Sequence, residues 1–225
     1  MPEGKLKAVL WDLDGVIADT GPYHCLAWQY VFHKRGVNFT EEDFKLHFGQ
    51  RNDNIIRDAI GDSISQEELD AIANEKEADY RRRIARNIQP LPGAVALIRS
   101  LGKHGIKAAI GSSAPPENIQ LILRRLAIDN CFQAIVWGRE VAEGKPSPQV
   151  FLLAAKKLGV EPLGCVVIED AIAGVAAAKT AGMKCIAVTN SHPKNSLKEA
   201  DFIVATLETV SISDLANLFL PAEAG

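Results

Sequence analysis

The sequence has little of what marks a nucleic-acid-binding, membrane or secreted protein. Its 25 Lys and Arg residues against 28 Asp and Glu residues give a formal net charge of −3, so it lacks the basic surplus of most nucleic-acid-binding domains. Because no apolar run approaches the roughly 18 residues of a membrane span, we expect no membrane partner. The start MPEGKLK is too short and polar for a signal peptide, so we expect a cytoplasmic protein.

The cysteines show no CxxC spacing, which argues against a zinc or redox motif. Three of the four lie in or beside apolar segments, and the full set is Cys25, Cys131, Cys165 and Cys185. We therefore expect small, buried, reduced side chains and assign them no chemistry.

Apolar, strand-like runs alternate with helical stretches along most of the chain. The proportions of hydrophobic (47%) and charged (24%) residues are those of an ordinary globular protein. Apolar residues at helical spacing, ending at glycine, fill the stretches between the runs. The alternation predicts an α/β fold with a doubly wound, parallel, Rossmann-like sheet. The expected strands are residues 7–12, 106–111, 132–137, 164–169, 184–189 and 201–204.

A long segment after the first strand breaks this alternation. Residues 20–88 contain no strand-like run, although a crossover between parallel strands needs only a dozen or so residues. We therefore expect a catalytic core of residues 1–19 and 89–225 with an inserted, all-α helical cap domain of residues 20–88. The final PAEAG is expected to be a frayed tail. The helices expected in the cap are residues 22–35, 41–48, 52–60 and 66–86.

Polar side chains follow four of the predicted strands, where ligands of open α/β sheets bind. Two acidic pairs around one crevice would repel each other unless they shared a cation, and oxygen ligands in an open site favour Mg²⁺. A lysine and a serine hydroxyl beside that metal would form a pocket for an anion with several oxygens, for which phosphate is the obvious candidate. The residues, in strand order, are Asp12 and Asp14, Ser112 and Ser113, Lys145, and Glu169 and Asp170.

Taken together, these elements resemble the haloacid dehalogenase superfamily, in the subgroup with a helical cap after the first strand. The resemblance rests on DLDGV after a strand, a serine closing the second strand, Lys-Pro after the third and an acidic pair closing the fourth. It covers about residues 7–205. It implies chemistry on a small phosphorylated metabolite with Mg²⁺ as cofactor, carried out by a monomer.

The resemblance also implies a role for each motif residue. Asp12 would be the nucleophile that forms an aspartyl phosphate, and Asp14 would be the general acid for the leaving group and then the base for water. Two residues apart on an extended chain, these carboxylates face the same side. A carboxylate nucleophile splits one difficult transfer into two easier steps. Acid–base assistance from a second carboxyl group increases the rate by about 10²–10⁴-fold.

The remaining implied roles concern the metal and the phosphate. Mg²⁺ would be bound by Asp12 and Asp170 through their carboxylates, by the Asp14 backbone carbonyl, and by Glu169 directly or through water. Ser112 and Lys145 would hold the transferring phosphoryl group, and Gly15 would permit the tight turn beside it. Structural explanations stay open: the acidic residues could cap turns or helices, and Ser113 could take the place of Ser112.

Substrate selectivity should come from the cap, because a phosphate pocket alone cannot choose among phosphate esters. Arg51, in FGQRND, could fork onto a second anionic or hydroxyl-rich part of the substrate. His24 and Lys76 are further candidates, although solvated residues on helices would explain them equally well.

The nearest subgroup is the β-phosphoglucomutase-like one. The stretch YHCLAW resembles the first cap helix of that subgroup. GSSAPPEN, however, lacks the basic residue that the mutase has after its serine, and Arg51 is displaced by one position. We therefore expect a phosphatase acting on a sugar or polyol phosphate. Three alternatives stay open: a phosphosugar mutase, a non-catalytic phosphate-ligand binding protein, and phosphonate cleavage, for which Lys76 could supply the cap lysine that this reaction needs. Dehalogenation is disfavoured because it has no use for Asp14 or a metal-binding acidic pair.

Overall fold

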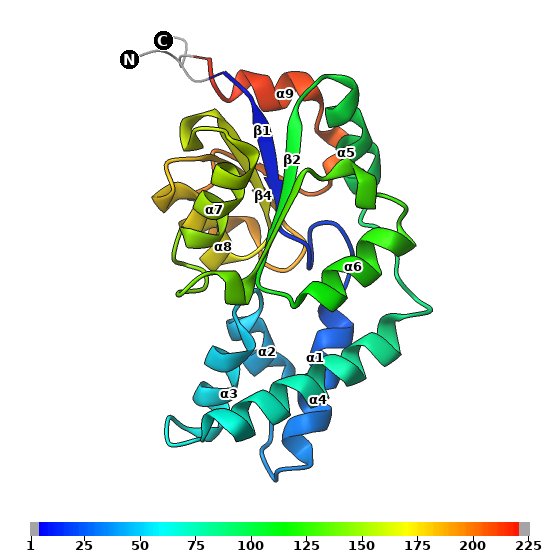
Figure 1. The fold of residues 1–225 in the computed structure, drawn as a ribbon, viewed down its shortest axis with the longest axis vertical. Coiled ribbons are helices and arrows are strands. Elements are labelled where there is room, and N and C mark those ends of the chain that lie inside the picture. The colour runs from blue at the N-terminus through cyan, green and yellow to red at the C-terminus, as the bar shows by residue number, and fades with distance from the viewer. Residues whose placement is uncertain (1–4, 221–225) are drawn as a thin grey trace.

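The computed structural model describes residues 5–220 of the chain and contains one six-stranded parallel sheet (Figure 1). The strand order is β3-β2-β1-β4-β5-β6, so the chain starts in the middle of the sheet and builds outward in both directions. This architecture confirms the predicted α/β fold. The strands are β1 (Ala8–Trp11), β2 (Lys107–Ser112), β3 (Ala134–Trp137), β4 (Cys165–Glu169), β5 (Lys184–Val188) and β6 (Phe202–Val204).

Strand β1 lies between β2 and β4, and its register brings three strand ends level with one another. Trp11 pairs with Ile110 of β2 and with Ile168 of β4. Residues that follow these three strands therefore meet at one edge of the sheet. All four residues of β1 are buried, which explains why a central parallel strand is a continuous apolar run.

Helices cover both faces of the sheet. Val9 and Trp11 point to the face covered by α5, α6 and α9, while Ala8 and Leu10 point to the face covered by α7 and α8. This alternation follows from the period of two along a strand. The helices of this layer are α5 (Ala94–Lys103), α6 (Pro116–Arg125), α7 (Gln149–Leu158), α8 (Ile172–Thr180) and α9 (Ile212–Asn217).

The segment between β1 and α5 forms four helices beyond the carboxyl ends of β1 and β2 (Figure 1). They pack around their own apolar cluster, in which Trp28 and Phe32 of the first helix meet Ile56 and Ile72. An inserted helical region after the first strand is thus confirmed, while its division from the core at residues 20 and 88 stays a prediction. The helices are α1 (Gly21–His33), α2 (Glu41–His47), α3 (Asn52–Ile60) and α4 (Gln66–Ile84).

Local side-chain chemistry explains where two of these helices begin. Thr40 accepts a hydrogen bond from the Asp43 N–H and the Asp43 carboxylate accepts one from the Thr40 N–H, which forms a capping box for α2. Ser65 caps α4 in a similar way by accepting from the Glu68 N–H.

Three other expectations concern the C-terminal tail, membrane-spanning helices and the cysteines. The predicted tail PAEAG lies outside the described residues. Within residues 5–220, none of the helices combines the length and apolar character needed to cross a membrane. Three cysteines are buried as expected, and Cys131 is half-buried.

Candidate active site

The first candidate residue, Asp12, is held at the sheet edge by its own backbone. Its N–H donates to the Ile168 carbonyl at 3.0 Å, which extends the pairing of β1 with β4 by one residue. The chain then turns at Gly15, whose φ of +78° is unfavourable for other residues. A Cβ at Gly15 would lie 2.0 Å from Asp170 Oδ2. The turn therefore requires glycine, both for its backbone conformation and for the close approach of Asp170.

Three carboxylates meet at this edge. Asp12, Glu169 and Asp170 each place one oxygen within 4.8 Å of the others, and all three side chains are buried. Asp170 Oδ2 accepts from the Ser191 hydroxyl, but Asp170 Oδ1 is buried without a hydrogen-bond partner among residues 5–220. An all-oxygen donor set with one unsatisfied oxygen suits a hard divalent cation such as Mg²⁺. The acidic cluster therefore fits a metal that these three side chains could hold.

Lys145, from the loop before α7, lies against the same cluster. Its Nζ donates to Asp12 Oδ1 at 2.5 Å and to Glu169 Oε1 at 2.6 Å. Burial by itself lowers the pKa of Lys145, but the charges of Asp12 and Glu169 outweigh it and raise that pKa. Burial raises the pKa of Asp12 to about 7, with Lys145 opposing the rise and Glu169 adding to it. The lysine is thus a fixed cation beside the nucleophile candidate.

The two serines after β2 have different neighbours. Ser112 is buried, lines the same cavity as Asp12, and accepts from the Ala114 N–H at 3.1 Å. Ser113 lines the cavity as well, but its hydroxyl donates to the Gly49 carbonyl of the α2–α3 loop at 2.9 Å. The geometry therefore leaves Ser112 beside the carboxylates and uses Ser113 to tie the inserted helices to the core.

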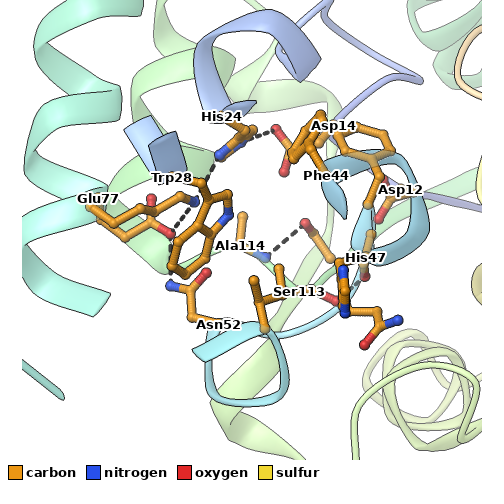
Figure 2. A pocket seen from close by; sticks show the side chains of 16 residues that line it. Asp12, Asp14, His24, Trp28, Phe44, His47, Asn52, Glu77, Ser113 and Ala114 are labelled. Atoms are coloured by element: carbon orange, nitrogen blue, oxygen red, sulfur yellow. Dashed lines mark hydrogen bonds and ion pairs between the residues drawn. The ribbon is translucent and has the colours of Figure 1, made fainter. Parts of the chain in front are cut away.

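Asp14 faces the inserted helices instead of the acidic cluster. His24 Nε2 lies 3.2 Å from Asp14 Oδ1, and Lys76 Nζ lies 2.8 Å from His24 Nδ1 (Figure 2). His24 also stacks on Tyr80 with ring centroids 3.8 Å apart. Burial by itself raises the pKa of Asp14, but the charge and hydrogen bond of His24 hold that pKa below its ordinary value. Two neighbouring carboxyl groups are therefore held in different electrostatic surroundings.

A narrow cavity of about 40 Å³ lies between the sheet edge and the inserted helices. Figure 2 shows Asp12, Asp14, His24 and Trp28 around it. Its lining comprises Asp12, Asp14, His24, Trp28, Phe44, His47, Phe48, Gly49, Gln50, Asn52, Ile55, Lys76, Glu77, Ser112, Ser113 and Ala114.

Arg51, expected to contact substrate, lies outside this cavity. Its guanidinium pairs with Asp53 at 2.8 and 3.0 Å and donates to the carbonyls of Val141 and Ala142. The side chain also packs on Gly144, where a Cβ would lie 2.5 Å from Arg51 Cδ. Arg51 therefore joins the inserted helices to the loop that carries Lys145, and its contact with substrate stays a prediction.

The structure also brings together residues that the sequence analysis did not single out. Glu77 and Asn118 form a buried hydrogen bond of 2.6 Å across the interface between α4 and α6. A Cβ at Gly174 of α8 would lie 1.8 Å from Glu169 Oε1, so this glycine makes room for the acidic cluster. Gly174 could have been found as an isolated glycine inside a helical pattern. Ser191, which donates to Asp170, carries no such signal.

Comparisons with known proteins agree with this geometry. The family model described as haloacid dehalogenase-like hydrolase matches residues 6–182. The chain is 37% identical to β-phosphoglucomutase from Bacillus subtilis over 212 residues, covering 88% of this chain and 89% of the relative. It is 33% identical to the fructose-1-phosphate phosphatase YqaB from Escherichia coli over 187 residues, covering 82% and 97%.

A solved structure extends the likeness to three dimensions. β-Phosphoglucomutase from Clostridium difficile superposes with a TM-score of 0.86 at 29% identity, covering 95% of this chain and 97% of that one. The chain therefore belongs to the haloacid dehalogenase-like hydrolase family, in the β-phosphoglucomutase and sugar phosphatase subgroup with a helical insert after the first strand.

Proposed function

We propose that this protein is a Mg²⁺-dependent phosphatase that hydrolyses a small phosphorylated metabolite, a sugar or polyol phosphate, through an aspartyl phosphate on Asp12. The observation that carries this proposal is the contrast between Asp12, beside Lys145 and the acidic cluster, and Asp14, beside His24. In this proposal one carboxylate reacts with phosphorus and the other handles the proton.

In the first half-reaction a carboxylate oxygen of Asp12 attacks phosphorus and the bond from phosphorus to the ester oxygen breaks. Asp14, which must be protonated for this step, gives its proton to that oxygen, which leaves as an alcohol. In the second half-reaction Asp14 takes a proton from water, and the oxygen of that water attacks phosphorus. The acyl phosphate then breaks, which releases phosphate and restores the Asp12 carboxylate.

The surrounding residues offset the charge of the transferring group. Asp12, Glu169 and Asp170 would hold Mg²⁺, which neutralises charge on phosphoryl oxygens when bound. Lys145 supplies a second, fixed positive charge, and Ser112 supplies a hydroxyl for a phosphoryl oxygen.

Two observations favour a phosphatase over a mutase, which must grip a bisphosphate at both ends. Arg51 is engaged by Asp53 and by backbone carbonyls outside the cavity. Pro115 and Pro116 follow Ala114, so no basic side chain directly follows the serines. The fructose-1-phosphate phosphatase among the relatives supports a sugar phosphate as the substrate class, while the mutase relatives keep a mutase as the second candidate.

The test is release of inorganic phosphate from a panel of sugar phosphates, glycerol phosphate, phosphoglycolate and an aryl phosphate, with Mg²⁺ and with chelator. A coupled assay for β-glucose 1-phosphate conversion to glucose 6-phosphate, primed with a bisphosphate, runs in parallel. We expect Mg²⁺-dependent release that is fast for one sugar or polyol ester. Rapid isomerisation with little release would establish the mutase, and phosphate binding without turnover would establish a binding protein.

A further inference from the structure

A buried ion pair occupies the end of the cavity away from Asp12. Lys76 and Glu77 are neighbours on α4, and Lys76 Nζ donates to Glu77 Oε1 at 2.8 Å. Both residues are nearly inaccessible, at 2% and 6% exposed, and both line the cavity. Among the described residues that line it, Lys76 is the only lysine or arginine. The charge at this end of the cavity therefore depends on how completely Glu77 cancels that of Lys76.

Hydrogen bonds from two other elements fix the Glu77 carboxylate. Asn52 donates to Oε1 at 2.8 Å, and Asn118 of α6 donates to Oε2 at 2.6 Å. Asn118 is itself oriented by Arg81, which donates to its carbonyl oxygen at 2.9 Å. Burial opposes ionisation of Glu77, but Lys76 and His24 outweigh it and lower the pKa to about 2. Glu77 is thus a fixed anion at neutral pH.

Lys76 has little capacity left for an anionic ligand. Besides Glu77, its ammonium group donates to His24 Nδ1 at 2.8 Å and lies 4.9 Å from the centre of the Trp28 ring. The other ring nitrogen of His24, Nε2, faces Asp14 at 3.2 Å.

We propose that Glu77 is a specificity-determining residue: it cancels the charge of Lys76 and restricts the enzyme to substrates whose only anionic group is the phosphate beside Asp12. A second phosphate or a carboxylate would be desolvated beside Glu77 and Asp14 without a free cation to pair with it. A neutral hydroxyl-bearing group can instead hydrogen-bond to the polar lining. This inference rests on the proposed function and defines its substrate class.

The test compares matched esters that differ in one carboxylate. Glycerol 3-phosphate is paired with 3-phosphoglycerate, and glucose 6-phosphate with 6-phosphogluconate. We expect the wild-type protein to favour the neutral member of each pair in kcat/KM. We expect Glu77→Gln, which removes the negative charge but keeps the side-chain shape, to reduce this preference by about tenfold or more. Adding Lys76→Met to Glu77→Gln should restore the preference, because the cation whose charge is no longer cancelled is then gone.

Asp79→Asn is the matched control. Asp79 is a second buried carboxylate of α4, 2% exposed and paired with Arg82 and Arg83, but it does not line the cavity. Its loss should leave the preference unchanged. An unchanged preference in Glu77→Gln, or an equal change in Asp79→Asn, would overturn the inference.

A binding measurement separates this inference from the proposed function. Calorimetric dissociation constants for the same four esters with Mg²⁺ report the preference even without turnover. Absence of hydrolysis by the wild-type protein would contradict the proposed function alone. Equal affinity changes for neutral and carboxylate esters in Glu77→Gln would contradict the role of Glu77 alone.

Discussion

Asp12 and Asp14 are only two residues apart, yet their surroundings move their pKa values in opposite directions. Burial and the nearby Glu169 raise the pKa of Asp12, while His24 holds that of Asp14 below its ordinary value. A bound cation would favour the ionised form that Asp12 needs as a nucleophile, whereas Asp14 must gain a proton before it can act as the acid. The sequence places both carboxylates at one strand end, but only their neighbours distinguish them.

Replacing Asp14 with Asn should slow hydrolysis in a way that depends on the leaving group. For a sugar phosphate, whose alkoxide needs a proton, we expect kcat/KM to fall about 10²–10⁴-fold. For an aryl phosphate with a good leaving group, the first half-reaction needs no acid, so the fall in kcat/KM should be smaller. Steady-state phosphate release with both esters measures this, and equal losses would contradict the role of general acid.

His24→Ala removes the hydrogen-bond donor that lowers the pKa of Asp14. Loss of that donor should raise the pKa of Asp14, so the limb of the pH profile that Asp14 governs should move to higher pH. The profile of kcat/KM is the measurement, and His104→Ala, at an exposed histidine far from Asp14 in the sequence, is the control. A limb that stays in place would show that His24 does not act on Asp14.

Among the helices, α8 shows how an element is shaped by the site beside it. Replacing a glycine inside a helix with alanine normally stabilises the helix by about 0.5–1 kcal/mol. At Gly174, however, the added Cβ would displace the Glu169 carboxylate. We expect Gly174→Ala to destabilise the fold and weaken Mg²⁺ binding. Thermal unfolding and a Mg²⁺ titration of activity measure the two effects.

Gly102→Ala in α5 is the matched control, because nothing lies within 4 Å of a Cβ there. It should leave Mg²⁺ dependence unchanged and stabilise the protein by up to about 1 kcal/mol. A Gly174→Ala protein with unaltered Mg²⁺ dependence would contradict the idea that this glycine positions Glu169.

The elements themselves could be predicted well because their signals are local. Buried parallel strands are continuous apolar runs, and all six were placed within two residues at either end. The inserted helices were found by the same local periodicity.

Contacts between distant segments could not be predicted in this way. The Glu77–Asn118 bond joins residues 41 positions apart, and Arg51 reaches the carbonyls of Val141 and Ala142, 90 and 91 positions away, because of packing that no short pattern encodes.

For the molecule as a whole, the inserted helices are closed onto the core by polar contacts around the cavity. Ser113 donates to Gly49 on one side, and Asn118 donates to Glu77 on another. Arg51 adds contacts to Val141 and Ala142. These contacts hold the inserted helices over the cavity, and closure of this kind shields reacting groups from bulk water.

Arg51→Ala tests how this closure acts on catalysis. If Arg51 positions the loop that carries Lys145, its loss should lower kcat/KM for sugar and aryl phosphates by similar factors. If instead it contacts the sugar, as the sequence suggested, KM for the sugar phosphate should rise while aryl phosphate hydrolysis stays the same. We expect the first result, and steady-state kinetics with the two esters distinguishes them.

The most direct test of the central claim is to trap phosphate on Asp12. In Asp14→Asn with an aryl phosphate, formation of the aspartyl phosphate needs no acid while its hydrolysis lacks a base, so the intermediate should accumulate. Acid quenching and mass spectrometry of the peptide containing Asp12 should then show one phosphoryl group on that residue, and Asp12→Asn should show neither label nor turnover. A phosphoryl group on another residue, or near-normal activity in Asp12→Asn, would contradict the account.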